Sequence, residues 1–302
     1  MKASITDIQF CSLHDGPGIR TMVFFAGCGM RCKWCQNPEA FSAKPKLQIN
    51  DRLCIGCQEC FNACPYCAVA IDPAGGVLYN RKICKDCMAC AEKCYALARK
   101  PSAKEISLDD LLAEALSDRV FFNQSGGGVT LSGGEPLLQA DFNREFLKEL
   151  KNQGISTAVE TAGCYPAKNL EKVLPYADLF LFDIKLMDPL KHAWWTGVDN
   201  AQILSNFERA AKSARVILRV PLIPGVNDGE EFDSILAFAA KTGHVNELHI
   251  LPFHHMGDEK YTQLGYACSM AQVNAENEDN IGRCRQAAEK AGFSVSVGGR
   301  GF

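Results

Sequence analysis

Residues 20–35 read RTMVFFAGCGMRCKWC, a short apolar run that leads directly into three closely spaced cysteines. The β-branched and aromatic residues at 21–25 predict a buried strand. The loop after this strand carries Cys28, Cys32 and Cys35, with no fourth cysteine at a matching spacing. Structural zinc needs four closed ligands, so a zinc site fits this loop poorly. Three thiolates on a [4Fe-4S] cluster would instead leave one iron open for substrate.

Beyond residue 100, short β-branched or apolar runs alternate with amphipathic stretches. This alternation is typical of repeated βα units around a parallel sheet. The expected strands after the first one are residues 129–132, 156–160, 179–183, 216–220, 247–251 and 294–297. The expected helices are residues 108–117, with Ser107 as the N-cap, 141–153, 200–212, 230–242 and 276–291. The pattern predicts an α/β fold, a full or partial (β/α) TIM-like barrel.

Polar residues gather where these expected strands end. The strand ends lead into Gly27-Cys28, Ser132-Gly133-Gly134-Glu135, Glu160-Thr161, Asp183-Ile184-Lys185 and Pro252-Phe253-His254. The chemistry of (β/α) barrels is located at the carboxyl ends of the strands. We therefore expect these five segments to form one site.

Residues 51–99 interrupt the βα pattern with dense cysteine, proline and glycine. Two runs there share the spacing C-x2-C-x2-C-x3-C, which is typical of two-cluster bacterial ferredoxins, where the fourth cysteine of each run binds the other cluster. The spacing predicts one [4Fe-4S] site made of Cys54, Cys57, Cys60 and Cys94, and another made of Cys84, Cys87, Cys90 and Cys64. We therefore expect a barrel formed by residues 1–50 and 100–302, and a ferredoxin-like insert at 51–99 with two clusters.

Several cysteines fall outside these sets. Cys67 is supernumerary and is either inert or a substitute for Cys64. Cys164, Cys268 and Cys284 are isolated and are interpreted as small buried apolar residues.

The composition limits the class of protein. The chain has 302 residues, sixteen cysteines and a formal net charge of -3 with both signs mixed, which gives no electrostatic footprint for nucleic acid or an anionic membrane. No apolar run reaches the roughly 20 residues of a membrane span, and the N-terminus has no export signal. A cytoplasmic location is expected. Because a reducing cytosol does not keep disulfides closed, the clustered cysteines are interpreted as metal ligands.

The three-cysteine loop resembles the signature of the radical S-adenosylmethionine (SAM) superfamily. The wider match resembles one family within it, the glycyl radical enzyme activating enzymes. It covers HDGPGIRT at 14–21, FFAGC at 24–28, WCQNPE at 34–39, SGGGVTLSGGEP at 125–136, ETAG at 160–163, DIK at 183–185, RVP at 219–221 and LPFHHMG at 251–257. The match therefore runs through essentially the whole chain, in order.

The resemblance implies roles for particular residues. The cluster bound by Cys28, Cys32 and Cys35 would hold SAM through its open iron, with Asp183 and Lys185 completing the catalytic set. SAM contacts are implied at Trp34, Gln36, Asn37, Gly133, Gly134, Glu135, Asp183, Ile184, Lys185 and His254. A monovalent cation site is implied at Glu160, Thr161 and the backbone of Leu181, whereas His255 stays unassigned. Ala26 departs from the lysine that many relatives carry, and no prediction is attached to it.

The resemblance also implies a reaction. One electron from the cluster cleaves SAM to a 5′-deoxyadenosyl radical, which removes hydrogen from a glycine of a partner glycyl radical enzyme of the lyase, dehydratase or decarboxylase type. The two insert clusters would relay electrons from ferredoxin or flavodoxin, or would be structural staples. The alternatives are a radical SAM enzyme that acts on a small molecule or peptide, and a ferredoxin-like electron carrier.

Overall fold

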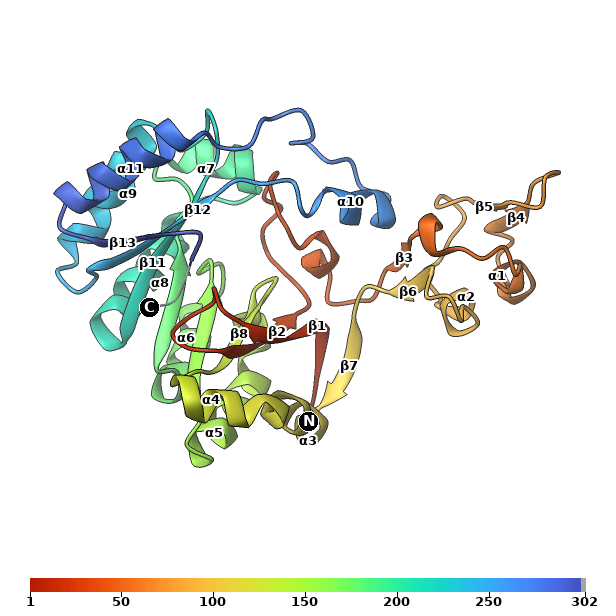
Figure 1. Cartoon of the computed structure of the whole chain (residues 1–302), viewed down its shortest axis with the longest axis horizontal. Coiled ribbons are helices and arrows are strands. Elements are labelled where there is room, and N and C mark those ends of the chain that lie inside the picture. The colour runs from red at the N-terminus through yellow and green to blue at the C-terminus, as the bar shows by residue number, and fades with distance from the viewer. Residues whose placement is uncertain (300–302) are drawn as a thin grey trace.

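The computed structural model describes residues 1–299, and its main body is built on a nine-stranded sheet (Figure 1). Seven neighbouring strands run parallel. They are β2 (Arg20–Phe25), β8 (Gly128–Gly133), β9 (Ser156–Thr161), β10 (Leu179–Asp183), β11 (Arg215–Leu222), β12 (Glu247–Pro252) and β13 (Ser294–Val297). Within residues 1–299 the sheet stays open, because β13 forms one edge and does not pair with the opposite edge. All seven predicted strands are confirmed, and the barrel is the partial form.

Two strands at the other edge were not predicted. β1 (Lys2–Ser12) pairs antiparallel with β2 and with β7 (Lys104–Ser107). The sequence did not reveal β1 because its burial alternates only at its start, and its second half is mostly exposed. Two register irregularities, between Ile5 and Asp7 and between Gln9 and Ser12, interrupt the pairing as well.

Helices connect the parallel strands. The main body contains α3 (Leu108–Ala115), α4 (Arg119–Ser125), α5 (Ala140–Asn152), α6 (Ala167–Val173), α7 (Pro189–Thr196), α8 (Ala201–Ser213), α9 (Glu230–Lys241), α10 (Asp258–Leu264) and α11 (Glu278–Lys290). The five predicted helices are confirmed within a few residues, and Ser107 caps α3 by accepting a hydrogen bond from the Asp110 backbone. The four that were not predicted, α4, α6, α7 and α10, have eight residues or fewer, so their periodic signal is short.

The core lies between the sheet and these helices. The first four residues of β10, Leu179 to Phe182, are all buried, as a strand covered on both faces requires. The Phe182 ring packs edge to face against Phe207 of α8, with ring centroids 5.2 Å apart. Burial of a side chain of this size stabilises the fold by roughly 1.5–3 kcal/mol. The carboxyl ends of the strands are thus held by a rigid core.

Residues 47–101 form a separate lobe, which extends to the right of the main body in Figure 1. It contains β3 (Leu47–Ile49), α1 (Glu59–Ala63), β4 (Val69–Ile71), β5 (Val77–Tyr79), α2 (Ala89–Glu92) and β6 (Arg99–Pro101). β3 and β6 form an antiparallel ribbon in which Leu47 pairs with Pro101 and Ile49 with Arg99. β3 ends just before the predicted boundary at 50, and β6 spans the predicted boundary at 100.

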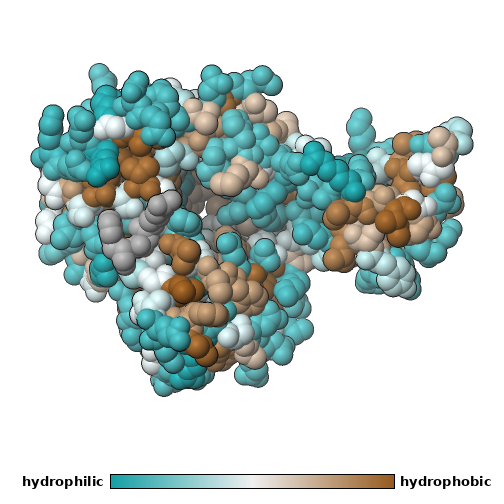
Figure 2. All heavy atoms as spheres, in the orientation of Figure 1, coloured by the Kyte–Doolittle hydropathy of each residue, from teal (hydrophilic) through white to brown (hydrophobic). Residues whose placement is uncertain are grey.

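The lobe is an internal repeat with little apolar core. Gln58 and Met88 have left-handed backbones with φ of 63° and 64°, and Cys67 and Leu97 have φ of 52° and 53°. Each pair holds the same place in the two cysteine runs. Figure 2 shows apolar patches on the lobe surface, and its exposed large apolar residues are Leu53, Ile55, Phe61, Tyr66, Leu78, Ile83, Tyr95 and Leu97. Small units with so little apolar core commonly gain stability from metals or cross-links.

Over residues 1–299, the helices are too short or too polar to span a lipid bilayer.

Candidate functional site

A cavity of about 580 Å³ lies at the carboxyl ends of the parallel strands. Most of the predicted cluster and SAM residues line it together. They are Cys28, Cys32, Cys35, Trp34, Gln36, Asn37, Gly133, Gly134, Asp183, Lys185 and His254. Glu135 and Ile184 do not line it and are buried behind it. Residues from four segments that are far apart in the sequence thus meet in one place.

Backbone hydrogen bonds hold the three-cysteine loop in this cavity. The Gly27 N–H donates to the carbonyl of Ala40 at 2.8 Å, and the Arg31 N–H donates to the carbonyl of Thr196 at 2.7 Å. Thr196 is the last residue of α7, so a helix that the sequence analysis missed supports the loop. The cysteine spacing predicts the ligands, whereas the segments that support the loop are distant in the sequence.

The three thiols of this loop lie in a poorly solvated environment. Burial raises the pKa of all three thiols. The pKa of Cys32 rises to about 12, and that of Cys35 rises further. A bound metal would compensate the charge of the buried thiolates and allow these thiols to lose their protons. The backbone N–H groups of Met30 and Asn37 donate to the sulfurs of Cys28 and Cys35, each at 3.4 Å. The thiols and the N–H donors fit a metal cluster.

A single metal ion does not fit the cysteines. Across residues 1–299, no three cysteine, histidine or carboxylate groups converge as one ion requires. The zinc alternative would need such convergence. In a [4Fe-4S] cluster each thiolate binds a different iron, so the sulfurs need not approach a common point.

Gly133 and Gly134 bring the end of β8 against the end of β2. A Cβ on Gly133, whose φ is 111°, would lie 2.7 Å from the Phe24 carbonyl carbon. A Cβ on Gly134 would lie 2.8 Å from the Gly27 carbonyl carbon and 2.9 Å from the Ala40 carbonyl oxygen. Both glycines are therefore required by backbone packing, in addition to any contact with a ligand.

Glu135 connects the loop after β8 to the end of β9. Its carboxylate accepts hydrogen bonds from the Thr161 hydroxyl at 2.8 Å, the Ala162 N–H at 3.1 Å and the Leu137 N–H at 3.2 Å. Burial raises the pKa of Glu135 to about 7, although these donors favour the charged form. Glu135 does not line the cavity, and its hydrogen bonds hold the end of β9 against the loop after β8; its contact with SAM stays a prediction.

Charged side chains form a buried network on one wall of the cavity. The Lys185 ammonium donates to Asp183 at 2.8 Å. Arg219, whose side chain is 8 % exposed, lies 3.4 Å from Glu160, 3.6 Å from Asp15 and 3.8 Å from Asp183. Burial lowers the pKa of Arg219, but these three carboxylates outweigh burial and raise it overall. The charges of the network therefore largely compensate one another.

Neither Arg219 nor Asp15 was predicted as a site residue. Their segments were noticed only as parts of the wider match, and nothing near either residue marks it as an ion-pair partner. The contact forms because β11 places Arg219 beside Asp183 of β10, while the loop before β2 brings Asp15 to the same wall.

The side chains expected to bind a monovalent cation have protein partners. Glu160 faces Arg219 and also accepts a hydrogen bond from Ser132 at 2.6 Å. The Thr161 hydroxyl donates to Glu135. The guanidinium of Arg219 thus lies where the resemblance implies a cation.

The two histidines that follow β12 face different surroundings. His254 lines the cavity, where burial lowers its pKa. One ring nitrogen of His255 lies 2.9 Å from Asp258 and the other 2.7 Å from the carbonyl of Val273. His255 therefore holds the segment after α10 and leaves the cavity to His254.

Helix α10 holds the residues that follow Cys35. The Lys260 ammonium donates to the Gln36 carbonyl at 3.0 Å, the Asn37 side chain at 3.1 Å and Glu39 at 2.6 Å. The Tyr261 hydroxyl donates to the Cys35 carbonyl at 2.9 Å. Both residues were missed, since a lysine and a tyrosine in a short helix give no signal of this role.

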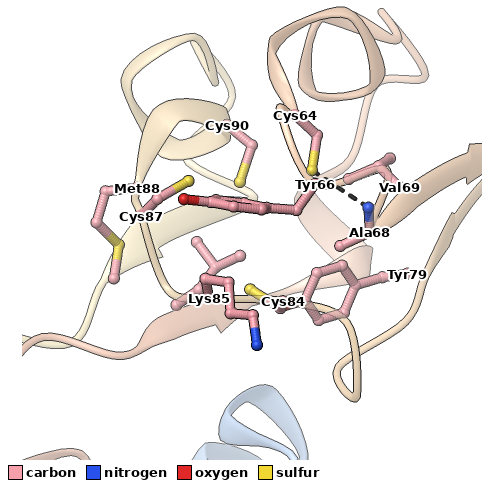
Figure 3. Close-up of a pocket in the computed structure, with 11 residues that line it drawn as sticks. Cys64, Tyr66, Ala68, Val69, Tyr79, Cys84, Lys85, Cys87, Met88 and Cys90 are labelled. Carbon is pink, nitrogen blue, oxygen red and sulfur yellow. Dashed lines mark hydrogen bonds between the residues drawn. The ribbon is translucent and has the colours of Figure 1, made fainter.

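The cysteines of the lobe divide into two groups, each around a small cavity. Cys54, Cys57, Cys60 and Cys94 line one cavity, and Cys64, Cys84, Cys87 and Cys90 line the other, as Figure 3 shows for the second. These sets are the ones expected from the spacing. Cys67 is exposed and lines neither cavity.

Backbone donors reach the lobe cysteines as they do the first loop. The N–H groups of Ala68 and Asp86 donate to the sulfurs of Cys64 and Cys84, each at 3.3 Å. Figure 3 shows the first of these bonds, and Cys84, the acceptor of the second, lines the same cavity. The two donors would stabilise thiolates bound to a cluster.

Comparison with known proteins finds two family models. Residues 55–239 match the radical SAM superfamily, and residues 14–54 match a 4Fe-4S single cluster domain. Among curated relatives, the indoleacetate decarboxylase activating enzyme of Tractidigestivibacter scatoligenes is 39% identical, over 98% of each chain. The isethionate sulfite-lyase activating enzyme of Desulfovibrio desulfuricans is 38% identical, over 97% of this chain and 96% of the relative. The 4-hydroxyphenylacetate decarboxylase activating enzyme of Clostridioides difficile is 40% identical, over 99% and 96%.

Proposed function

This chain belongs to the activating enzymes of glycyl radical enzymes, within the radical SAM superfamily, and we propose that it performs this activation with three [4Fe-4S] clusters. The observation that carries the proposal is the single cavity that holds Cys28, Cys32 and Cys35 together with Gly133, Gly134, Asp183 and Lys185. Three thiols, exposed backbone and a buried charge pair are the groups that a cluster and the amino acid part of SAM require.

The protein's own residues would bind and orient SAM. Cys28, Cys32 and Cys35 would hold the cluster, and the backbone of Gly133 and Gly134 would lie beside the methionine amino group. Lys185 and Asp183, opposite in charge, would face the polar groups of SAM, with His254 beside the nucleoside. When bound, the cluster supplies one electron that cleaves SAM to methionine and a 5′-deoxyadenosyl radical, which removes hydrogen from a glycine Cα of the partner.

The apolar walls of the cavity would protect this chemistry from water. Trp34, Leu186, Ile223, Phe253 and Met270 form a buried cluster at the site. Trp34, Ile223 and Phe253 line the cavity directly. A dry site strengthens the interactions between its charged groups and prevents loss of a reactive intermediate.

For the lobe, we propose that residues 51–99 are a separate unit whose two cysteine sets bind two clusters, and that they relay electrons from ferredoxin or flavodoxin. The support is its contact with α10. The Arg81 guanidinium donates to the carbonyl of Gln263 in α10 and, at 3.2 Å, to the carbonyl of Leu47. A blue helical segment below Lys85 and Cys84 in Figure 3 agrees with this contact. The helix that contacts Cys35 therefore also contacts the lobe.

A monovalent cation is left out of the proposal, because Arg219 already neutralises Glu160. For the partner, we propose a glycyl radical enzyme of the decarboxylase, lyase or dehydratase type. The relatives described above activate decarboxylases and a lyase, and the trans-4-hydroxy-L-proline dehydratase activating enzyme of Clostridioides difficile is a further relative, 36% identical over 99% of this chain.

The test is anaerobic. The protein is loaded with iron and sulfide, reduced, and given SAM with one candidate partner from each of the three types, while 5′-deoxyadenosine and the EPR spectrum are recorded. We expect a glycyl radical doublet on one partner, absent with Cys32→Ala and retained with Cys284→Ala, a control at a buried cysteine of α11.

Two results would contradict the proposal. SAM cleavage without a glycyl signal from any partner would favour a small-molecule or peptide substrate. A fully loaded protein that leaves SAM intact would refute SAM cleavage altogether.

A further inference from the structure

We propose that Arg99 is the shared counter-ion of the two cluster sites in the lobe and raises the reduction potentials of both. This inference rests on the proposed function, since it assumes that both sets of cysteines bind clusters. It concerns a residue that is neither a cysteine ligand nor part of the SAM cavity.

Arg99 is a buried cation without a carboxylate partner. It is 3 % exposed and begins β6, opposite Ile49. Its Nη1 is buried and has no hydrogen-bond partner, and within residues 1–299 Arg99 forms no ion pair with a carboxylate. A buried charge left in this state is strongly destabilising. Because no carboxylate within residues 1–299 neutralises this charge, an anion bound beside Arg99 would stabilise the fold.

The position of Arg99 brings it to both cysteine sets. It lines the cavity of Cys54, Cys57, Cys60 and Cys94. Its guanidinium carbon lies 5.3 Å from the ring centroid of Tyr79, which lines the other cavity. One guanidinium thus lines one candidate cluster site and contacts an aromatic ring that lines the other.

The internal repeat supports a shared role. Arg99 stands five residues after Cys94, and the matching position five residues after Cys64 is Val69. Only one half of the repeat therefore carries a cation at this place. Two lysines, Lys85 and Lys93, also line the cavities. Both are exposed, so water screens their charges.

The negative charge of a [4Fe-4S] cluster would match the positive charge of Arg99. A [4Fe-4S] cluster held by four thiolates is negatively charged, and its sulfides and thiolates accept hydrogen bonds. Each cluster gains one electron on reduction, and its negative charge increases by one. A nearby guanidinium stabilises the reduced form more than the oxidised form, and therefore raises the potential.

The experiment is an EPR-monitored redox titration of the full-length, fully loaded protein, with iron and sulfide counted for every variant. Arg99→Met removes the charge, Arg99→Lys keeps it, and Lys100→Met is the matched control, because Lys100 is the exposed neighbour on the same strand. We expect Arg99→Met to lower the reduced-to-oxidised ratio of both lobe clusters at a fixed potential by about tenfold, equivalent to about 59 mV. Arg99→Lys should keep most of the wild-type potential, and Lys100→Met all of it.

The other possible results separate a failure of this inference from a failure of the proposed function. A loaded Arg99→Met protein with unchanged potentials overturns the inference, whereas a wild-type protein without the lobe clusters contradicts the proposed function instead. If Arg99→Met loses the lobe iron, Arg99→Gln is titrated in its place with the same expectation. If both neutral variants lose that iron and Arg99→Lys retains it, the charge is required as proposed. If all three lose it, the shape of arginine rather than its charge is needed, and the inference is overturned.

Discussion

Replacement of Gly134 by alanine tests how tightly the cluster loop is held. The new Cβ would lie 2.8 Å from the Gly27 carbonyl carbon and 2.9 Å from the Ala40 carbonyl oxygen, both backbone atoms. Ordinary contacts between carbon atoms lie at about 3.5–4.0 Å, so the two backbones must separate by about 1 Å. Gly27 directly precedes Cys28, and this movement therefore displaces the first thiol of the site.

The magnitude follows from this displacement. Overpacking of a rigid region costs about 1–3 kcal/mol, and we expect about 2 kcal/mol because only backbone can move. A misplacement of about 1 Å at a reacting centre can lower the rate about 100-fold. We therefore expect Gly134→Ala to fold and bind iron, but to cleave SAM about 100-fold more slowly.

The assay compares 5′-deoxyadenosine formation per cluster with the midpoint of anaerobic urea unfolding. Gly282→Ala is the control, because a Cβ on Gly282 of α11 would meet nothing within 4 Å. That control should keep the wild-type rate and gain up to about 1 kcal/mol of stability. A Gly134→Ala protein with both the wild-type rate and the wild-type urea midpoint would refute the packing argument.

Three further variants test other parts of the site. Lys185→Met leaves Asp183 without its closest cation, so we expect a loss of about 3 kcal/mol in unfolding free energy and a raised KM for SAM. The control Lys148→Met, at an exposed lysine of α5, should change neither. The pKa of Glu135 is raised to about 7, above the value of about 4.5 expected in the unfolded chain. The folded protein therefore gains about 3 kcal/mol below pH about 4.5, and this stabilisation is lost as the pH rises through 7. Glu135→Gln should abolish that pH dependence of the urea midpoint. Lys260→Met releases the segment after Cys35, and we expect about tenfold weaker SAM binding and an altered cluster EPR signal, with no change in lobe iron.

The sequence predicted the regular parts of the fold well. The parallel strands are buried on both faces, and their β-branched and aromatic runs are visible without any knowledge of neighbours. Closure of the barrel was not predictable, because it depends on how the edge strands pair. β1 was missed for a similar reason, since an edge strand with an exposed half does not show a continuous apolar run.

Local spacing also determined how much of the site could be predicted. Cysteines that are close together in one loop indicate a shared metal site, and the ends of the strands indicated where Asp183 and Lys185 lie. The contacts of Arg219 with Asp15 and of Lys260 with Glu39 join segments some 200 residues apart. They depend on tertiary structure alone, so no local pattern reveals them. Arg99 was missed because a lone arginine in a strand is ordinarily a surface residue.

The paired ribbon of Leu47 and Pro101 has an evolutionary consequence. Since the chain enters and leaves the lobe at one place, a single genetic insertion or deletion between these residues could add or remove the whole lobe, while the order of the barrel strands stays unchanged. Such an event would have one cost. A barrel without the lobe would lose the contact between Arg81 and α10, and the helix that holds the cluster loop would have to acquire a different support.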